Sequence, residues 1–177
     1  GAASGGFWIS TDNGATWSKS ITGMTRLGVS SIVVHPTTPN IIYIGTGDRD
    51  GGDAPGYGVW RSTDGGATWA AYNSGMGNRT VYEILMDPTN SNRLIASTNG
   101  SRIYRSLDGG ATWTYSGGLT NAKDIAFKPG DPNTIYAAGT QFSYSTDGGV
   151  TFTLNGGIAA ESRYAIGVTA ANANYVY

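Results

Sequence analysis

Ser10-Thr11-Asp12-Asn13-Gly14-Ala15-Thr16-Trp17 is the first of four closely related octapeptides in this chain of 177 residues. The other three octapeptides lie at residues 62–69 (STDGGATW), 106–113 (SLDGGATW) and 145–152 (STDGGVTF). Their aspartates stand at positions 12, 64, 108 and 147, so they recur at intervals of 52, 44 and 39 residues. Recurrence at such a period is typical of stacked supersecondary units, and it predicts a repeat architecture.

Short apolar runs accompany each octapeptide, and turn residues (Gly, Asn, Asp and Pro) separate them, as expected of strands and their connections. The first strands are expected at 31–36, 83–88 and 124–129, with a degenerate copy at 165–170, and the second at 41–46, 93–98, 134–139 and 174–177. Third strands at 58–61, 102–105 and 141–144 lead into an octapeptide, and a fourth strand leaves it through its Trp or Phe. No stretch shows a helical period, and 28 glycines argue against long helices. The sequence therefore predicts repeats of four strands.

The pattern Ser-x-Asp-x-Gly-x-Thr-Trp resembles the Asp-box, also called the BNR repeat, which marks β-propeller blades in sialidases, xyloglucanases and sortilin-type receptors. A second segment, residues 45–53 (GTGDRDGGD), is similar to multi-repeat proteins of Bacteroidetes whose chains often end in a sorting domain for type IX secretion. These resemblances cover essentially the whole chain. They imply an all-β fold, a β-propeller of four-stranded antiparallel blades.

The strand pattern divides the chain into a half blade at 1–20, blades at about 26–72, 79–116 and 122–155, and a half blade at 163–177. The two half blades either join to close a small four-bladed ring or belong to an arc of a larger propeller. We favour the arc of about three full blades plus two half blades. Asp-box propellers usually carry more than four blades, and the run at 175–177 lacks the terminal cap that stacked arrays need.

Composition favours a secreted module without a nucleic-acid partner. Hydrophobic residues make up 39% of the chain, the formal charge is -1, and only 13% of residues are charged, with Lys and Arg scattered. Neither nucleic acid nor membrane insertion is therefore expected. The chain has no cysteine, so disulfides are not expected to stabilise it. Low charge with abundant Gly, Ser, Thr, Asn and Tyr favours a secreted or cell-surface location in a bacterium.

The repeated aspartates of the Asp-boxes are interpreted as structural. Asp and Ser side chains bind nearby backbone amides in tight turns, glycines accept a positive φ, and the ring that follows can pack on a neighbouring blade. Family resemblance agrees, because Asp-boxes lie on the propeller rim, away from the ligand site. The structural set is Ser10, Asp12, Gly14, Trp17, Ser62, Asp64, Gly66, Trp69, Ser106, Asp108, Gly110, Trp113, Ser145, Asp147, Gly149 and Phe152.

The loop at 45–58 is the best candidate for a ligand contact. It is an insertion, since the equivalent connection in the next repeat is only 99–101, and it should lie on the face opposite the Asp-box turns. Asp48, Asp50 and Asp53 lie within six residues, and they are candidate ligands of calcium or another hard cation. The alternative is that these aspartates only solvate a surface turn. Tyr57 is a candidate for stacking on a sugar.

No catalytic set is predicted. Sialidases use an arginine triad with a Tyr–Glu pair, but glutamate occurs here only at 83 and 161, and the sole histidine, His35, stands at a turn position. We therefore expect a non-catalytic secreted scaffold or binding module for glycan or protein, without a cofactor unless the loop holds calcium, and forming part of its own larger chain. The alternative is a fragment of a glycoside hydrolase, xyloglucanase-like or sialidase-like, with some catalytic residues outside these 177.

Overall fold

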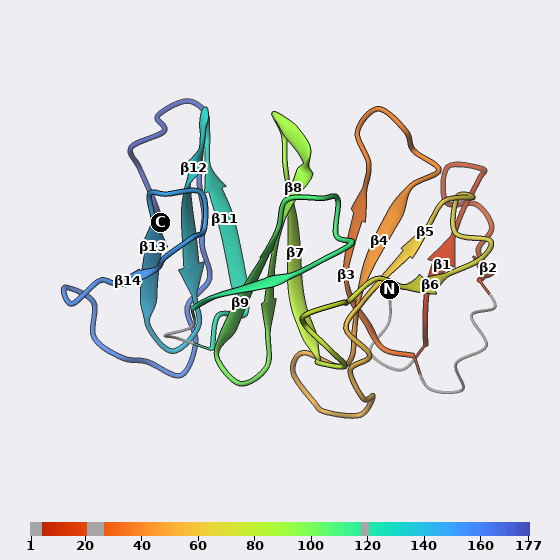
Figure 1. The fold of residues 1–177 in the computed structure, drawn as a ribbon, viewed down its shortest axis with the longest axis horizontal. Helices are drawn as coiled ribbons and strands as arrows, with labels where there is room; N and C mark the ends of the chain where they lie inside the picture. The colour runs from red at the N-terminus through yellow and green to blue at the C-terminus, as the bar shows by residue number, and fades with distance from the viewer. Residues whose placement is uncertain (1–4, 21–26, 118–120) are drawn as a thin grey trace.

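The computed structural model describes residues 5–20, 27–117 and 121–177; the expected half blade 1–20 and the blade from about 26 therefore lie partly outside the described residues. The described chain contains strands and no helix (Figure 1). A two-stranded sheet comprises β1 (Trp8–Ile9) and β2 (Ser18–Lys19). Three four-stranded sheets follow, made by β3 (Val29–Val34), β4 (Ile42–Thr46), β5 (Val59–Ser62) and β6 (Ala70–Ala71); by β7 (Val81–Asp87), β8 (Asn90–Thr98), β9 (Arg102–Ser106) and β10 (Thr114–Gly117); and by β11 (Asp124–Lys128), β12 (Asp131–Ala138), β13 (Phe142–Ser145) and β14 (Thr153–Leu154).

Each four-stranded sheet is antiparallel, and its strands lie in chain order. Among the first strands of the three sheets, β7 contacts both β3 and β11, so these strands form the inner side of an arc. This arrangement confirms the predicted propeller of four-stranded blades. It follows from short β-branched runs joined by glycine-rich turns, which form hairpins far more readily than crossovers.

The two ends of the arc do not close on each other. Strands β1 and β2 pair only with each other, and the described residues of 165–177 pair only among themselves. In that last segment Val168 and Val176 form a bridge, and Gly167 and Tyr177 exchange two backbone hydrogen bonds of 2.8 and 2.9 Å. The described chain is therefore an open arc and not a four-bladed ring.

Neighbouring sheets interlock where an Asp-box glycine meets a side chain of the preceding sheet. A Cβ placed on Gly110 would lie 3.3 Å from the ring of Tyr43, and one placed on Gly149 would lie 2.8 Å from Ile95 Cδ1. Both glycines have φ near +85°, at +88° and +83°, which only glycine adopts without strain. The second glycine of the box thus allows the turn to be tight and also lets the previous sheet approach.

A buried ion pair adds a polar link between the second and third four-stranded sheets. Asp87, whose side chain is 2% exposed, lies 2.6 Å from Arg93 Nη2, and Arg93 donates to Asn133 Oδ1 at 2.8 Å and to the carbonyl of Pro132 at 2.9 Å. Burial alone would raise the pKa of Asp87, but hydrogen bonds from Thr89 and the charge of Arg93 hold it below its usual value. Removing Arg93 would leave a buried carboxylate without its counter-ion.

Candidate functional site

The four Asp-boxes share one hydrogen-bond network. In the third box, Asp108 accepts from Ser106 Oγ at 2.8 Å, from Thr112 N at 2.9 Å and from Thr112 Oγ1 at 2.6 Å, while the N–H of Gly110 donates to Ser106 Oγ at 2.8 Å. The boxes at 10–17, 62–69 and 145–152 repeat these bonds. The carboxylate of each Asp-box aspartate therefore accepts hydrogen bonds from residues of its own turn.

The electrostatics of the boxes agree with this geometry. Hydrogen bonds from Thr16 and Thr68 lower the pKa of Asp12 and Asp64 to about 2. Burial would raise the pKa of Asp147, but the bonds from Thr151 outweigh it and the value is also about 2. An aspartate that is so firmly ionised is unsuited to act as a general acid near neutral pH.

Each of the last three boxes is also tied to the first turn of its own sheet. The N–H groups of Gly65, Gly109 and Gly148 donate to the carbonyls of Asn40, Asn92 and Asn133, each at 2.9 Å. The box rings differ in burial: Trp113 is 3% exposed and Trp17 is 60% exposed, while Trp69 and Phe152 are half-buried. The box turns and the turns after β3, β7 and β11 therefore lie at the same end of the sheets.

The 45–58 loop lies at the opposite end, where Figure 1 shows it below the sheets. The loop is packed on the next sheet: the N–H of Gly58 donates to Arg79 O at 2.9 Å, and a Cβ on Gly56 would lie 2.0 Å from Thr80 N. Tyr57 is half-buried, and its N–H donates to Thr46 Oγ1 at 2.7 Å. The ring of Tyr57 packs against an apolar cluster, so it is not presented as a free stacking surface.

Loop residue Asp50 meets cations from three parts of the chain. Its carboxylate lies 3.2 Å from Arg49 Nε, 3.0 Å from Lys123 Nζ and 3.3 Å from Arg163 Nη1. The hydrogen bond from Lys123 holds the pKa of Asp50 below its usual value. Lys123 also lies over the ring of Tyr82, 5.8 Å from its centre. We call Arg49, Asp50, Tyr82, Lys123 and Arg163 the loop-face cluster.

The loop aspartates do not converge on one point. Asp48 accepts the N–H groups of Asp50 at 3.0 Å and of Asp53 at 3.1 Å, which lower its pKa. Asp50 is engaged by cations, and Asp53 is exposed. Within 5–20, 27–117 and 121–177, no three His, Cys, Asp or Glu side chains are grouped so that they could hold a metal ion. The structure places the three aspartates on one loop, where Asp48 accepts backbone N–H groups, Asp50 is paired with cations and Asp53 is exposed.

The sequence analysis did not identify two carboxyl groups on the inner strands. Glu83 Oε2 accepts the N–H of Ile125 at 2.8 Å, and Asp124 Oδ2 accepts the N–H of Ile166 at 2.8 Å, each from the following repeat. Ser31 Oγ binds the N–H of Ile84 in the same way at 3.0 Å. Each of these three residues directly precedes an isoleucine at the start of a predicted first strand. This shared position is the sequence pattern that could have identified them.

Glu83 is a buried carboxyl group whose surroundings favour its neutral form. Burial raises its pKa to about 7, the nearby charge of Asp124 also raises it, and the Ile125 N–H and Arg49 oppose the shift. Glu83 can therefore hold a proton at neutral pH. Both carboxyl groups nevertheless serve as links between neighbouring sheets.

These features define an Asp-box β-propeller, and comparisons with known proteins identify its family. The chain belongs to the Sortilin-Vps10 family ("Sortilin, neurotensin receptor 3"), whose model matches residues 57–165, and the BNR/Asp-box repeat model matches residues 8–19. No curated protein sequence matches the chain. No helix among the described residues is long and apolar enough to cross a membrane.

Three solved structures illustrate the fold. An ancestral GH74 enzyme is 22% identical with a TM-score of 0.70, over 88% of this chain and 22% of its own. The GH74 enzyme of Niastella koreensis is 24% identical with a TM-score of 0.56, over 81% of this chain and 25% of its own. YCF48 bound to D1 peptide is 17% identical with a TM-score of 0.60, over 90% and 50%. The chain thus spans half or less of each of these proteins, and the likeness concerns the fold.

Proposed function

We propose that this chain is a non-catalytic propeller module of a secreted bacterial protein, and that it binds a protein or glycan ligand at the loop-face cluster. The single observation that carries this proposal is the meeting of Arg49, Lys123 and Arg163 around Asp50. These cations come from distant parts of the chain, yet they converge at the end of the sheets that the Asp-box turns leave free.

The chemistry of the cluster suits recognition of a polar ligand. Asp50 is about half exposed, and Arg163 is 45% exposed, so the ion pairs are accessible to solvent and individually weak. A ligand carboxylate or hydroxyl can exchange with them at little cost, and the buried ring of Tyr82, which is 8% exposed, lies under Lys123. Long loops that carry such groups on a rigid scaffold are a common form of binding site.

The comparisons support binding and also keep a second function in view. The description of the matched family names a receptor, which agrees with a binding role. One structural neighbour is described as bound to a peptide. Two other neighbours are described as GH74 enzymes. Extracellular location is proposed from the low charge of the chain and from the Asp-boxes.

Binding to a peptide panel and to xyloglucan oligosaccharides, measured by calorimetry, tests the proposal. Lys123→Ala should weaken binding of any ligand found by about tenfold, because it removes one charge-assisted contact. Lys128→Ala is the matched control, since Lys123 directly precedes β11 whereas Lys128 is the last residue of that strand. Equal binding by both variants would refute the site.

The second candidate function is hydrolysis of a glycan, and the Glu83–Asp124 pair is the observation that favours it. A protonated carboxyl beside a second carboxyl is the combination that glycosidases use. We propose binding instead, because both groups accept backbone N–H bonds between sheets. Sugar release from xyloglucan by the wild type, and its loss in Glu83→Gln, would reverse this preference.

A further inference from the structure

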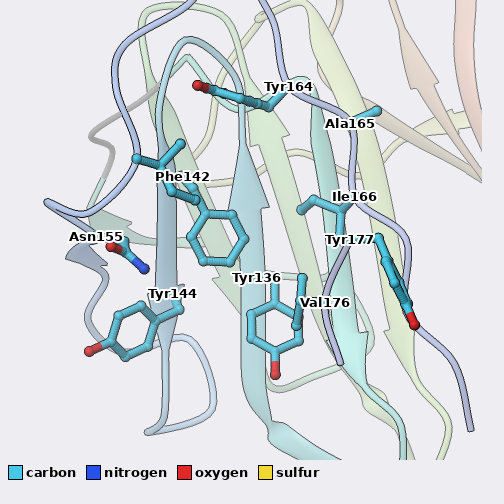
Figure 2. Close-up of a pocket in the computed structure, with 10 residues that line it drawn as sticks. Tyr136, Phe142, Tyr144, Asn155, Tyr164, Ala165, Ile166, Val176 and Tyr177 are labelled. Atoms are coloured by element: carbon cyan, nitrogen blue, oxygen red, sulfur yellow. The ribbon is translucent and has the colours of Figure 1, made fainter. Parts of the chain in front are cut away.

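Two hollows on the described sheets differ in the chemistry of their walls. The larger one, of about 390 Å³, lies on the last four-stranded sheet, where Figure 2 shows the rings of Tyr136, Phe142 and Tyr144, and no charged side chain lines it. The smaller one, of about 160 Å³, lies on the first four-stranded sheet beside the Asp-box at 62–69, and we call it the Arg61 hollow. It is lined by Arg61, Thr63, Thr68, Trp69, Ala70 and Tyr72. The smaller hollow therefore has a positively charged wall, which suits an anionic ligand.

Arg61 is a half-buried cation without an acidic partner among the described residues. All 12 acidic residues of the chain lie in the described ranges, and none of the ion pairs that they form involves Arg61. Its polar contacts are with neutral hydroxyls: Nη1 donates to Tyr72 Oη at 3.2 Å, and the hydroxyl of Tyr43 is also close. The Nε atom of Arg61 is buried and has no acceptor in the described chain. A half-buried charge with unused donors is unfavourable by itself, and a bound anion would compensate it.

Two aromatic rings hold the guanidinium of Arg61 in place. Its Cζ atom lies 4.9 Å from the centre of the Tyr72 ring and 5.8 Å from the centre of the Tyr43 ring. The next Asp-box fixes both rings, because a Cβ placed on Gly110 would lie 3.2 Å from Tyr72 Cδ1 and 3.3 Å from Tyr43 Cε1. A guanidinium that is stacked in this way loses little freedom on binding, and its planar set of N–H donors matches the oxygens of a carboxylate or sulfate.

The internal repeat shows that this arrangement is particular to the first four-stranded sheet. Arg105 is equivalent to Arg61, since Arg61 pairs with Tyr43 of β4 and Arg105 pairs with Ile95 of β8. An aliphatic side chain therefore replaces one of the two stacking rings. The walls of the hollow change as well: Thr63, Ala70 and Tyr72 correspond to Leu107, Thr114 and Ser116. Arg105 thus provides a matched control within the same chain.

We propose that the Arg61 hollow binds an oxyanion, either a carboxylate or a sulfate. Arg61 supplies the compensating charge and charge-assisted hydrogen bonds. Thr63, which is exposed at the second position of the box, supplies a hydroxyl beside it. The hollow adjoins an Asp-box turn, whereas the loop-face cluster lies at the opposite end of the sheets. The oxyanion site is therefore separate from the proposed function and does not depend on it.

Titration of the intact chain with sodium sulfate and with sodium glucuronate, followed by proton–nitrogen NMR, tests the proposal. Each anion that binds should shift the Arg61 Nε–H signal and the amide signals of residues 62–69 to saturation. Sodium chloride at equal ionic strength and uncharged glucose are the controls and should not do so. Saturation by glucuronate, by sulfate or by both supports the site and identifies its oxyanion. Saturation by neither anion, or an equal response to glucose, would overturn the proposal.

Variants then assign the response to the hollow. Arg61→Gln should weaken binding by about tenfold or more, because it removes the charge-assisted contact, whereas Arg105→Gln makes the same change of charge and should bind as the wild type does. Thr63→Leu leaves Arg61 in place and introduces the side chain that the next box carries at Leu107, so it should narrow the hollow in a folded protein and weaken binding.

Two further results would contradict the assignment. Equal binding by Arg61→Gln and Arg105→Gln would overturn it, and if Arg61→Gln does not fold, wild-type binding by Thr63→Leu would do so. Lys123→Ala, which alters the loop-face cluster, should leave oxyanion binding unchanged. A loss of binding in Lys123→Ala would place the anion at that cluster and would also overturn the proposal, while loss of another ligand alone would concern only the proposed function.

Discussion

Asp108→Ala should destabilise the protein without changing its fold, because it removes the acceptor of one complete Asp-box. The carboxylate accepts three hydrogen bonds, one from Ser106 and two from Thr112. At about 1 kcal/mol net for each bond, the sum is roughly 3 kcal/mol. Thr112 is close to solvent, and water can replace part of what it loses, so we expect a cost of about 2 kcal/mol.

For a chain of this size, that cost corresponds to a decrease in Tm of about 4–8 °C. Differential scanning calorimetry measures it, with Leu107→Ala as the control, since Leu107 lies in the same turn with its side chain exposed. Asp12→Ala should lower Tm less, because residues 11–17 are exposed and, among the described residues, a Cβ placed on Gly14 would meet only Trp17. A Tm within about 1 °C of the wild type for Asp108→Ala would refute the reasoning.

Arg93→Met should cost about 3 kcal/mol in urea unfolding, because Asp87 would be left as an unpaired buried charge; Arg102→Met, at an exposed position, is the control and should cost little. Glu83 has a folded pKa of about 7, above its ordinary 4.5, so its neutral form favours folding: that contribution is complete below pH 4.5 and is lost as pH rises through 7. Thermal unfolding at several pH values should therefore show wild type losing stability relative to Glu83→Gln across this interval, and parallel curves would contradict the assignment. Millimolar calcium or a chelator should leave Tm unchanged, since the carboxylates of Asp48 and Asp50 in the 45–58 loop have other partners; a shift in Tm with calcium would restore the metal hypothesis.

The sequence predicted the Asp-boxes and the strand repeats well because both are encoded locally. Ser106, Asp108, Gly110 and Thr112 satisfy one another within seven residues, so their spacing alone specifies the turn. Short alternating runs between such turns then leave little choice except hairpins. For the same reason the all-β arc of four-stranded blades could be predicted before any coordinate was known.

The sequence could not place the loop-face cluster or the hollow beside Tyr136 of β12, because both are formed by residues far apart in the chain. Asp50 meets Lys123 across 73 residues and Arg163 across 113. The three aspartates of the 45–58 loop suggested a cation site, and only the packing of three sheets showed that the protein's own cations surround Asp50. Likewise, Tyr136 is one tyrosine among 11 in the sequence. Tyr136 and Tyr43 each follow the residue that pairs with a box serine, but the next Asp-box turn covers Tyr43 whereas Tyr136 lines a hollow, and only the folded chain shows this difference. Local hydrogen bonds determine the repeat, whereas the stacking of repeats determines which side chains meet, and that stacking exists only in the folded chain.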